Sequence, residues 1–307
     1  MSRRKSGEAV TGWVIVDKPS GPTSSDVVNR VRRLFNARKA GHAGTLDPLA
    51  TGILPVALGE ATKTVPFIID AIKGYRFTIR FGEATSTDDA EGEIVERSPV
   101  RPARPEIEAA LPRFKGLIEQ VPPVFSAIKI DGERAYALAR AGETVEMKPR
   151  AVTIHEIRLL GCPASDQAEL EILCSKGTYV RSLARDLARA LGTVGHVSAL
   201  RRTRHGPFGE AAAIPLDKLC ALGHIAPAPD LGAHLLPLET ALDDIPALAV
   251  SGEDAARLKQ GQGILLRGRD APILSGSVLA VHRGDPVALT EYEKGQLRPV
   301  RVFNLVS

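Results

Sequence analysis

The chain has 307 residues, a length that favours either one large domain or a large domain with a small one. Hydrophobic residues make up 44% and charged residues 25%, which excludes a mainly disordered chain. The formal net charge of +4 suits a polyanionic partner, although many proteins that bind no nucleic acid are equally basic.

The first predicted elements are a strand and a basic helix. Residues 13–16 are a short apolar run that ends in the loop-like segment 17–22. Thr23 or Ser24 can then cap a helix whose apolar positions 27, 28, 31, 34 and 35 share one face, with arginines on its other side at 30, 32 and 33. Four glycines and two prolines predict that residues 41–59 form a loop.

The middle of the chain predicts several strands and a second long helix. Residues 75–81 alternate so that four aromatic or aliphatic side chains share one face of a strand, and residues 152–160 and 169–174 resemble further strands. A short helix is expected at 105–111. After residues 176–178 a longer helix carries a core stripe from Val180 to Leu191, with arginines at 181, 185 and 189 on a different side.

The end of the chain predicts a second, smaller unit. Residues 221–246 are rich in proline and alanine, as a connection between domains would be. Short strand-like runs follow at 263–266, 278–281 and 300–305, punctuated by glycines. We predict an α+β protein with a mixed or antiparallel sheet in a domain of residues 1–245, followed by a small β-rich domain of residues 246–307.

Several cellular settings and chemistries are excluded by missing patterns. No apolar signal segment follows the basic start, and no run approaches the ~18 apolar residues of a membrane span. The three cysteines are too scattered for a disulfide framework or a metal knuckle. Phosphate-binding glycine loops, zinc-deaminase and zinc-protease motifs and the hydrolase nucleophile elbow are missing. We expect a soluble cytoplasmic protein that uses no metal or cofactor.

The segment with the clearest chemical content is residues 41–52, GHAGTLDPLATG. Its glycines allow a close backbone approach to a ligand, and Pro48 restricts Asp47 to extended conformations. A carboxylate on a stiff loop beside a basic helix could do chemistry. Equally, an aspartate before a proline often only caps a turn, and composition alone favours that interpretation.

This segment resembles the catalytic signature of the TruB family, the tRNA pseudouridine-55 synthases. Further segments resemble the other motifs of the family in order and spacing, and together they cover residues 12 to about 217. They are DKPSGPTS at 17–24, KGY at 73–75, PPVFSA at 122–127 with GERAY at 132–136, KGTYVR at 176–181 and ALRRT at 199–203. More loosely, residues 247–307 resemble the small RNA-binding β-barrel of PUA type.

The resemblance implies an isomerase that converts a uridine of tRNA to pseudouridine. Asp47 would be the catalytic carboxylate, and Arg181 would pair with it, keep it ionised and orient it. Tyr75 would stack on the target uracil and assist proton transfer. Tyr179 and Leu200 would line the base pocket. From the alternation alone Tyr75 is a core residue, and plain core is nearly as good an interpretation for Leu200.

The remaining implied contacts concern RNA. His42 would fill the space that the flipped base leaves, and Lys18 would support the site or contact a phosphate. Phosphate contacts would come from the arginines at 30, 32, 33, 181, 185, 189, 201, 202 and 204. The partner would be the T arm of tRNA, bound by a monomer that needs no other protein. Two alternatives stay open: a tRNA-binding chaperone without activity, and the catalytic subunit of an RNA-guided synthase.

Overall fold

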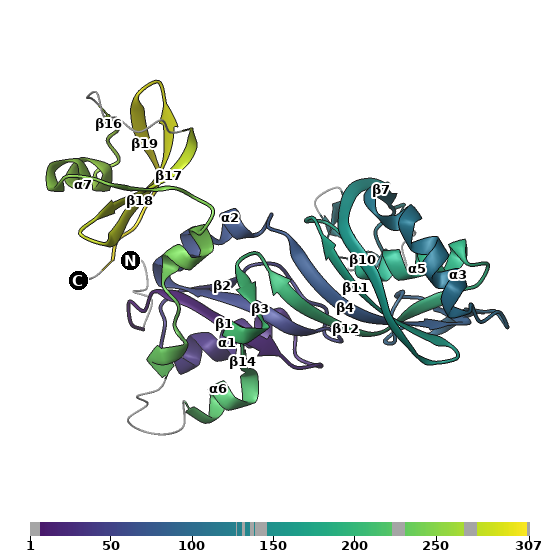
Figure 1. Ribbon diagram of the computed structural model, residues 1–307. Helices are drawn as coiled ribbons and strands as arrows, with labels where there is room; N and C mark the ends of the chain where they lie inside the picture. The colour runs from purple at the N-terminus through teal and green to yellow at the C-terminus, as the bar shows by residue number, and fades with distance from the viewer. Residues whose placement is uncertain are drawn as a thin grey trace.

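The computed structural model describes residues 7–126, 128–130, 133–135, 138, 146–222, 231–266 and 275–305. One large sheet dominates these residues and runs through the long body in Figure 1. Its strand order is β14 (Ile214–Pro215), β1 (Gly12–Lys18), β3 (Thr51–Leu58), β12 (Gly195–His205), β4 (Lys73–Phe81), β11 (Gln167–Cys174), β10 (Arg150–Ala164) and β7 (Gly116–Gln120), with β2 (Ala40–His42) paired to β3 and β13 (Phe208–Gly209) to β12.

The pairing in this sheet is mixed. Neighbouring strands are antiparallel except where β1 meets β14 and where β12 meets β3. The parallel contact is short, because it joins only Thr51 and Gly52 of β3 to Arg201 and Arg202 of β12. Beyond it the two strands diverge, and the start of β3 is held close to the middle of β12. The mixed sheet of an α+β fold is the class that the sequence predicts.

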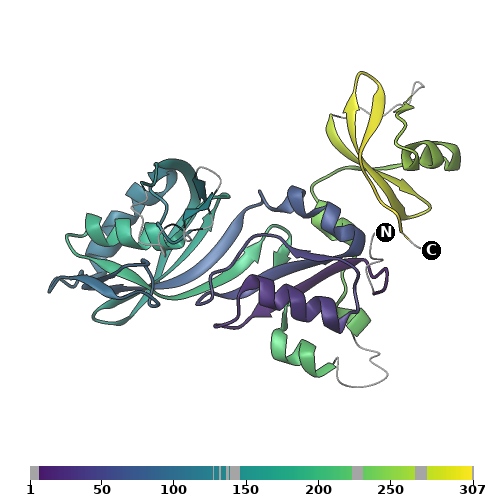
Figure 2. The same ribbon diagram turned by 180° about the vertical axis from the view of Figure 1, so that it is seen from behind.

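Helices pack on the sheet with their apolar sides toward it. They are α1 (Ser24–Leu34), α2 (Val65–Ile68), α3 (Arg104–Ala110), α5 (Val180–Ala190) and α6 (Leu216–Leu222). Thr23 caps α1 and forms a reciprocal capping box with Asp26, as the sequence predicts. In α5 the predicted stripe is buried, with Leu183 and Leu187 fully inaccessible. Figure 2 shows α1 lying along the sheet from behind.

The expectation of a loop over residues 41–59 is wrong for most of its length. Residues 51–58 form β3, a central strand whose residues from Gly52 onward are all buried. Gly52 and Pro55 are residues typical of loops, and for this reason the apolar run of β3 was not recognised as a strand. Pro55 lies opposite Ile15 of β1, and its carbonyl accepts the Ala43 amide at 3.1 Å. A proline is tolerated here because the pairing of β3 with β1 does not use an N–H at this position.

A smaller curled sheet forms the C-terminal part at one end of the long body in Figure 1, and it shares a buried apolar cluster with that body. Its order is β15 (Ala247–Ala249), β17 (Gly276–His282), β18 (Asp285–Glu293), β19 (Gln296–Val302) and β16 (Ile264–Leu265), with α7 (Gly252–Lys259) packed on it. The sequence predicts β16, β17 and β19 but misses β18 and α7. The boundary at residues 245 and 246 stays a prediction.

Two further two-stranded sheets complete the described elements, β5 (Glu83–Thr85) with β6 (Ile94–Arg97) and β8 (Lys129–Ile130) with β9 (Glu133–Arg134). The short 3-10 helices are η1 (Gly59–Lys63), η2 (Leu111–Phe114), η3 (Glu210–Ala212), η4 (Leu231–His234) and η5 (Leu238–Leu242). Part of the motif expected at 122–136 lies outside the described residues, including Ala127, Gly132 and Tyr136.

Candidate active site

Asp47 lies on the loop between β2 and β3, and buried polar groups fix this loop on both sides of it. The Lys18 ammonium, at the end of β1, donates to the carbonyls of Pro48 (3.0 Å) and Ala50 (2.7 Å) and also to that of Pro19. Ser24 accepts the Leu46 amide at 2.9 Å and donates to the Leu46 carbonyl at 3.0 Å. The carboxylate therefore sits on a backbone with little freedom to move.

Lys18 supports this loop rather than a phosphate. Its side chain is completely buried, and its three N–H bonds match the three carbonyls that surround it. Burial lowers the pKa of Lys18 to about 8, although the nearby Asp47 carboxylate partly opposes this shift. Of the two roles expected from the sequence, the geometry supports the structural one.

Arg181 forms the ion pair with Asp47 that the family resemblance implies. Its guanidinium lies 2.9 Å from the Asp47 carboxylate and 3.4 Å from that of Asp89. It also donates to the carbonyls of Thr87 and Phe125, each at 3.0 Å. Because the Arg181 side chain is only 6% exposed, all of these contacts are shielded from water, whereas the Asp47 side chain is 38% exposed toward the cavity.

Arg181 lowers the pKa of Asp47, as expected, but the net shift of that pKa is upward. Burial raises the pKa of Asp47 and the charge of Asp89 raises it further, while Arg181 and Lys18 lower it. The net direction is upward, because burial is the largest of these effects and Asp89 adds to it. Asp89 could not be recognised from the sequence, since a second carboxylate on the turn after β5 looks like an ordinary loop residue.

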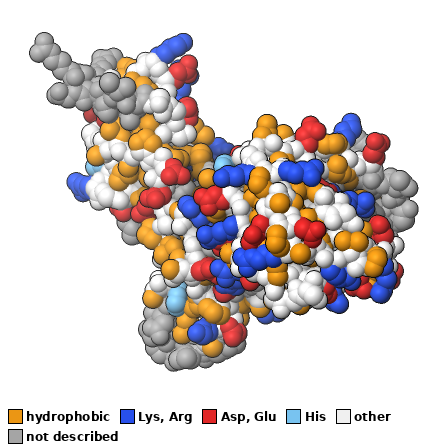
Figure 3. Space-filling view, turned by 45° about the vertical axis from the view of Figure 1, so that its right-hand side comes forward, with side chains coloured by type: hydrophobic (Ala, Val, Ile, Leu, Met, Phe, Trp, Pro, Cys, Tyr) orange, Lys and Arg blue, Asp and Glu red, His pale blue; other side chains and the backbone are white. Residues whose placement is uncertain are grey.

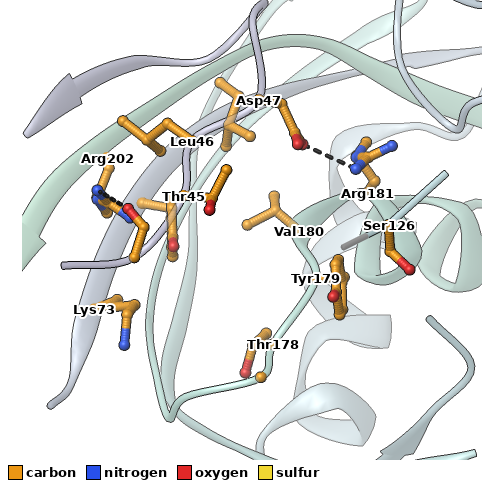
Figure 4. Close-up of a pocket in the computed structure, with 14 residues that line it drawn as sticks. Thr45, Leu46, Asp47, Lys73, Ser126, Thr178, Tyr179, Val180, Arg181 and Arg202 are labelled. Carbon is orange, nitrogen blue, oxygen red and sulfur yellow. Dashed lines mark hydrogen bonds and ion pairs between the residues drawn. The ribbon is translucent and has the colours of Figure 1, made fainter. Parts of the chain in front are cut away.

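A cavity of about 260 Å³ opens in front of this ion pair (Figure 4). Tyr75, Tyr179 and Leu200 all line it, as the sequence analysis expects of residues around a base. Tyr75 is on β4 with its side chain buried; burial raises its pKa, and the neighbouring Arg202 guanidinium opposes the shift. Burial also raises the pKa of Tyr179. Both phenols are therefore neutral hydrogen-bonding groups at pH 7.

His42 does not line this cavity. It lies on β2, half-buried, with a ring Nδ1 that has no hydrogen-bond partner among the described residues. Burial lowers its pKa, so the ring is neutral at pH 7. His42 is on β2, the strand that leads into the Asp47 loop.

Lys73, Ser126 and Arg202 also line the cavity, which the sequence does not predict for any of them. Arg202 was expected to contact phosphate, and this is wrong because its side chain is 1% exposed. The same correction applies to Arg181. The Ser126 hydroxyl is buried beside Tyr179 and Arg181 and has no partner in the described part of the chain (Figure 4). All three residues lie within the quoted motifs, and their place in these motifs could have indicated a role at the site.

A second concave site is basic and lies at the end of α1. It has a volume of about 450 Å³ and is lined by Arg32, Arg33, Arg38 and Lys39 together with three small or polar neighbours. All four basic side chains are exposed, and none is ion-paired within the described ranges. On the face shown in Figure 3 basic and acidic side chains are interspersed. This cavity is thus a local concentration of positive charge beside the strand that carries His42.

Comparisons with known proteins agree with this site. Residues 32–180 match the model of the TruB family pseudouridylate synthase N-terminal domain, and residues 181–243 match that of the tRNA pseudouridylate synthase B C-terminal domain. The tRNA pseudouridine synthase B of Bradyrhizobium diazoefficiens is 58% identical over 98% of this chain and 88% of its own length. That of Caulobacter vibrioides is 56% identical over 99% of this chain and 100% of its own.

Among solved structures, a chain of an H/ACA ribonucleoprotein bound to a substrate RNA containing 2′-deoxyuridine is similar with a TM-score of 0.73. It is 26% identical and covers 96% of this chain and 85% of its own. The fold and site therefore define a pseudouridine synthase. The chain belongs to the TruB family.

No helix in the described ranges is both long and apolar enough to cross a membrane.

Proposed function

We propose that this protein converts uridine 55 in the T loop of tRNA to pseudouridine, with Asp47 as the catalytic nucleophile. The observation that carries the proposal is the ion pair of Asp47 and Arg181 at the mouth of a cavity walled by two tyrosines and a leucine. Relatives more than 50% identical over nearly the whole chain are named tRNA pseudouridine synthase B, which supports tRNA as the substrate.

The reaction is an isomerisation and needs no co-substrate. The bond between N1 of uracil and C1′ of ribose breaks, the base turns, and C5 bonds to C1′. Asp47 either adds to the nucleotide or first removes the C2′ proton; both roles require a carboxylate that is ionised and fixed. The contacts of Lys18, Ser24 and Arg181 provide that fixed position.

The cavity residues act on the base. Tyr75 and Tyr179 present aromatic surfaces and phenol groups to the uracil, and Leu200 supplies an apolar wall. A base in a folded loop reaches this cavity only after extrusion, which costs a few kcal/mol of unstacking. His42, on the strand that leads into the Asp47 loop, takes the space that the base leaves and so offsets part of that cost.

The rest of the molecule binds the RNA. The basic cavity of Arg32, Arg33, Arg38 and Lys39 is built for phosphate, and the C-terminal part of residues 246–307 adds a second RNA-binding surface. The protein acts as a cytoplasmic monomer on the T arm without an obligate protein partner. Its similarity to an H/ACA protein is far weaker, at 26% identity, than its similarity to the bacterial synthases, so the RNA-guided alternative is not favoured.

The test compares the purified protein with its Asp47→Asn variant on an unmodified tRNA transcript. Pseudouridine is mapped by chemical labelling and primer extension, and tRNA binding is measured in parallel. We expect a new signal at position 55 with the wild type and none with Asp47→Asn, which still binds. Asp217→Asn, at an exposed position in α6, is the matched control and should react normally. Binding without any signal from the wild type would leave a tRNA chaperone as the better description.

A further inference from the structure

The two ends of the catalytic cavity differ in charge (Figure 4). At one end the single guanidinium of Arg181 serves the carboxylates of Asp47 and Asp89. At the other end lie Lys73 and Arg202, and neither is ion-paired with a carboxylate in the part of the chain that the structure describes. The cavity therefore has carboxylates at the Asp47 end and unpaired positive charges at the opposite end.

Lys73 has donor capacity left for a ligand. Its ammonium donates to the carbonyls of Ile69 and Ala71, each at 2.9 Å. An ammonium has three N–H bonds, so one remains for a group in the cavity that Lys73 lines. The side chain is 8% exposed, and the nearest surface carboxylate, Asp70, is paired instead with Lys176. Burial and the neighbouring Arg202 lower the pKa of Lys73 to about 8.

Arg202 and Lys18 are the two most deeply buried cations of the site. The Arg202 Nε donates to the carbonyl of Ile53 at 2.7 Å and its Nη2 to that of Gly44 at 3.2 Å. Its guanidinium also lies against the Tyr75 phenol. A buried cation that is held only by neutral acceptors is expensive, because its desolvation is not offset by an opposite charge. Two such cations facing one cavity indicate a ligand that becomes negative there.

The proposed reaction supplies such a ligand. When the bond from N1 to C1′ breaks, the electron pair stays on uracil and spreads over N1, O2 and O4. When C5 then bonds to C1′, the C5 proton leaves and N1 gains a proton, so that the base ends neutral. Uracil leaves with this electron pair whether Asp47 attacks the ribose or removes the C2′ proton. Negative charge on the detached base is thus common to both routes.

We propose that Lys73 and Arg202 stabilise the negative charge on uracil while it is detached from the ribose. The inference rests on the proposed function and assigns these two side chains to the base, in addition to the Asp47 and Arg181 pair. Donors already aimed at a developing charge in a site shielded from water need no reorganisation during the reaction. Tyr75 also lines the cavity, and its phenol neighbours Arg202.

The test is a single-turnover comparison of two substrates, a tRNA carrying uridine at the target position and the same tRNA carrying 5-fluorouridine. The rate measured is that of breaking the bond between N1 and C1′, because C5 of 5-fluorouridine carries fluorine and has no proton to lose in the last step. The base of 5-fluorouridine is the stronger acid, so its anion needs less stabilisation. Lys73→Met should slow the rearrangement of uridine roughly 100-fold, the size of effect seen on removing one donor to a developing anion. The loss with 5-fluorouridine should be several-fold smaller, and Lys73→Arg, which keeps the charge, should restore most of the rate.

Controls separate this role from structural effects. Lys218→Met, at an exposed position in α6, should leave both rates unchanged. If Lys73→Met does not fold, Lys73→Gln keeps donors for the two carbonyls without the charge and permits the same comparison. An equal loss on both substrates, in a variant that unfolds like the wild type, would overturn the inference and leave the proposed function intact. A wild type that rearranges neither substrate would overturn both.

Discussion

Replacing Arg181 by methionine tests how far the active site depends on one buried cation. The side chain has four contacts, two of them to carboxylates, and it is 6% exposed. Removing one partner of a buried ion pair leaves an uncompensated charge and costs about 3–5 kcal/mol. That is a large part of the roughly 5–15 kcal/mol that stabilises a typical domain. We expect urea unfolding to show a loss in this range.

The loss should come chiefly from Asp89, the more buried of the two carboxylates, whose side chain is 4% exposed. Adding Asp89→Asn removes the orphaned charge, so the double variant should be more stable than the sum of the single losses by about 2 kcal/mol. Turnover should not recover, because Asp47 still lacks its partner. If one guanidinium serves both a structural and a catalytic carboxylate, the double variant should regain stability but not activity.

Arg185→Met is the matched control, one turn further along α5. Arg185 pairs with Asp88 at 2.9 Å, but its side chain is 21% exposed and that of Asp88 is 16% exposed, so water can solvate either group. We expect a loss of about 1 kcal/mol, the scale of a partly exposed pair. If both methionine variants lose equally, or if the Arg181 and Asp89 losses are strictly additive, the reasoning from burial is wrong.

Two further predictions follow from the same geometry. The charge of Asp89 raises the pKa of Asp47, so Asp89→Asn should lower that pKa. Because the reaction needs an ionised Asp47, the acid limb of kcat/KM against pH should move to lower pH in this variant, while an unmoved limb would place the titration elsewhere. Gly52 has φ +96°, and a Cβ there would lie 2.2 Å from a carbonyl oxygen of β12. Gly52→Ala should therefore lose more than about 2 kcal/mol in urea unfolding, whereas Gly21→Ala, with φ +108° but open space around it, should lose only about 1 kcal/mol.

Periodicity predicted the elements that have one clear buried face. The alternation over residues 75–81 matches β4, whose four apolar side chains are all buried, and the stripe of α5 is equally regular. Periodicity failed for β3, which is buried on both faces and so shows no alternation. There the local signals of Gly52 and Pro55 dominated the interpretation. Only tertiary pairing with β1 and β12 shows why both residues are accepted in a central strand.

The candidate site could be read from the sequence only in part, and burial explains the division. Composition alone favoured a turn-capping role for Asp47, and the motif resemblance pointed to catalysis. In the helix pattern Arg181, Arg185 and Arg189 look alike, yet Arg181 is buried in an ion pair, Arg185 is half-buried and Arg189 is exposed. No spacing rule distinguishes them, because the difference arises from where the start of α5 meets the turn after β5.

The four buried cations of the site differ in what they contact, and this difference separates structural from chemical roles. Lys18 donates to two carbonyls of the Asp47 loop and to that of Pro19, so its three N–H bonds are all used in holding the backbone. Arg181 neutralises carboxylates. Lys73 and Arg202 also bind carbonyls, but they have no described acidic partner and line the opposite wall. A carboxylate that donates electron density on one side and unpaired cations that receive it on the other are the arrangement that moving an electron pair from the glycosidic bond onto the base requires.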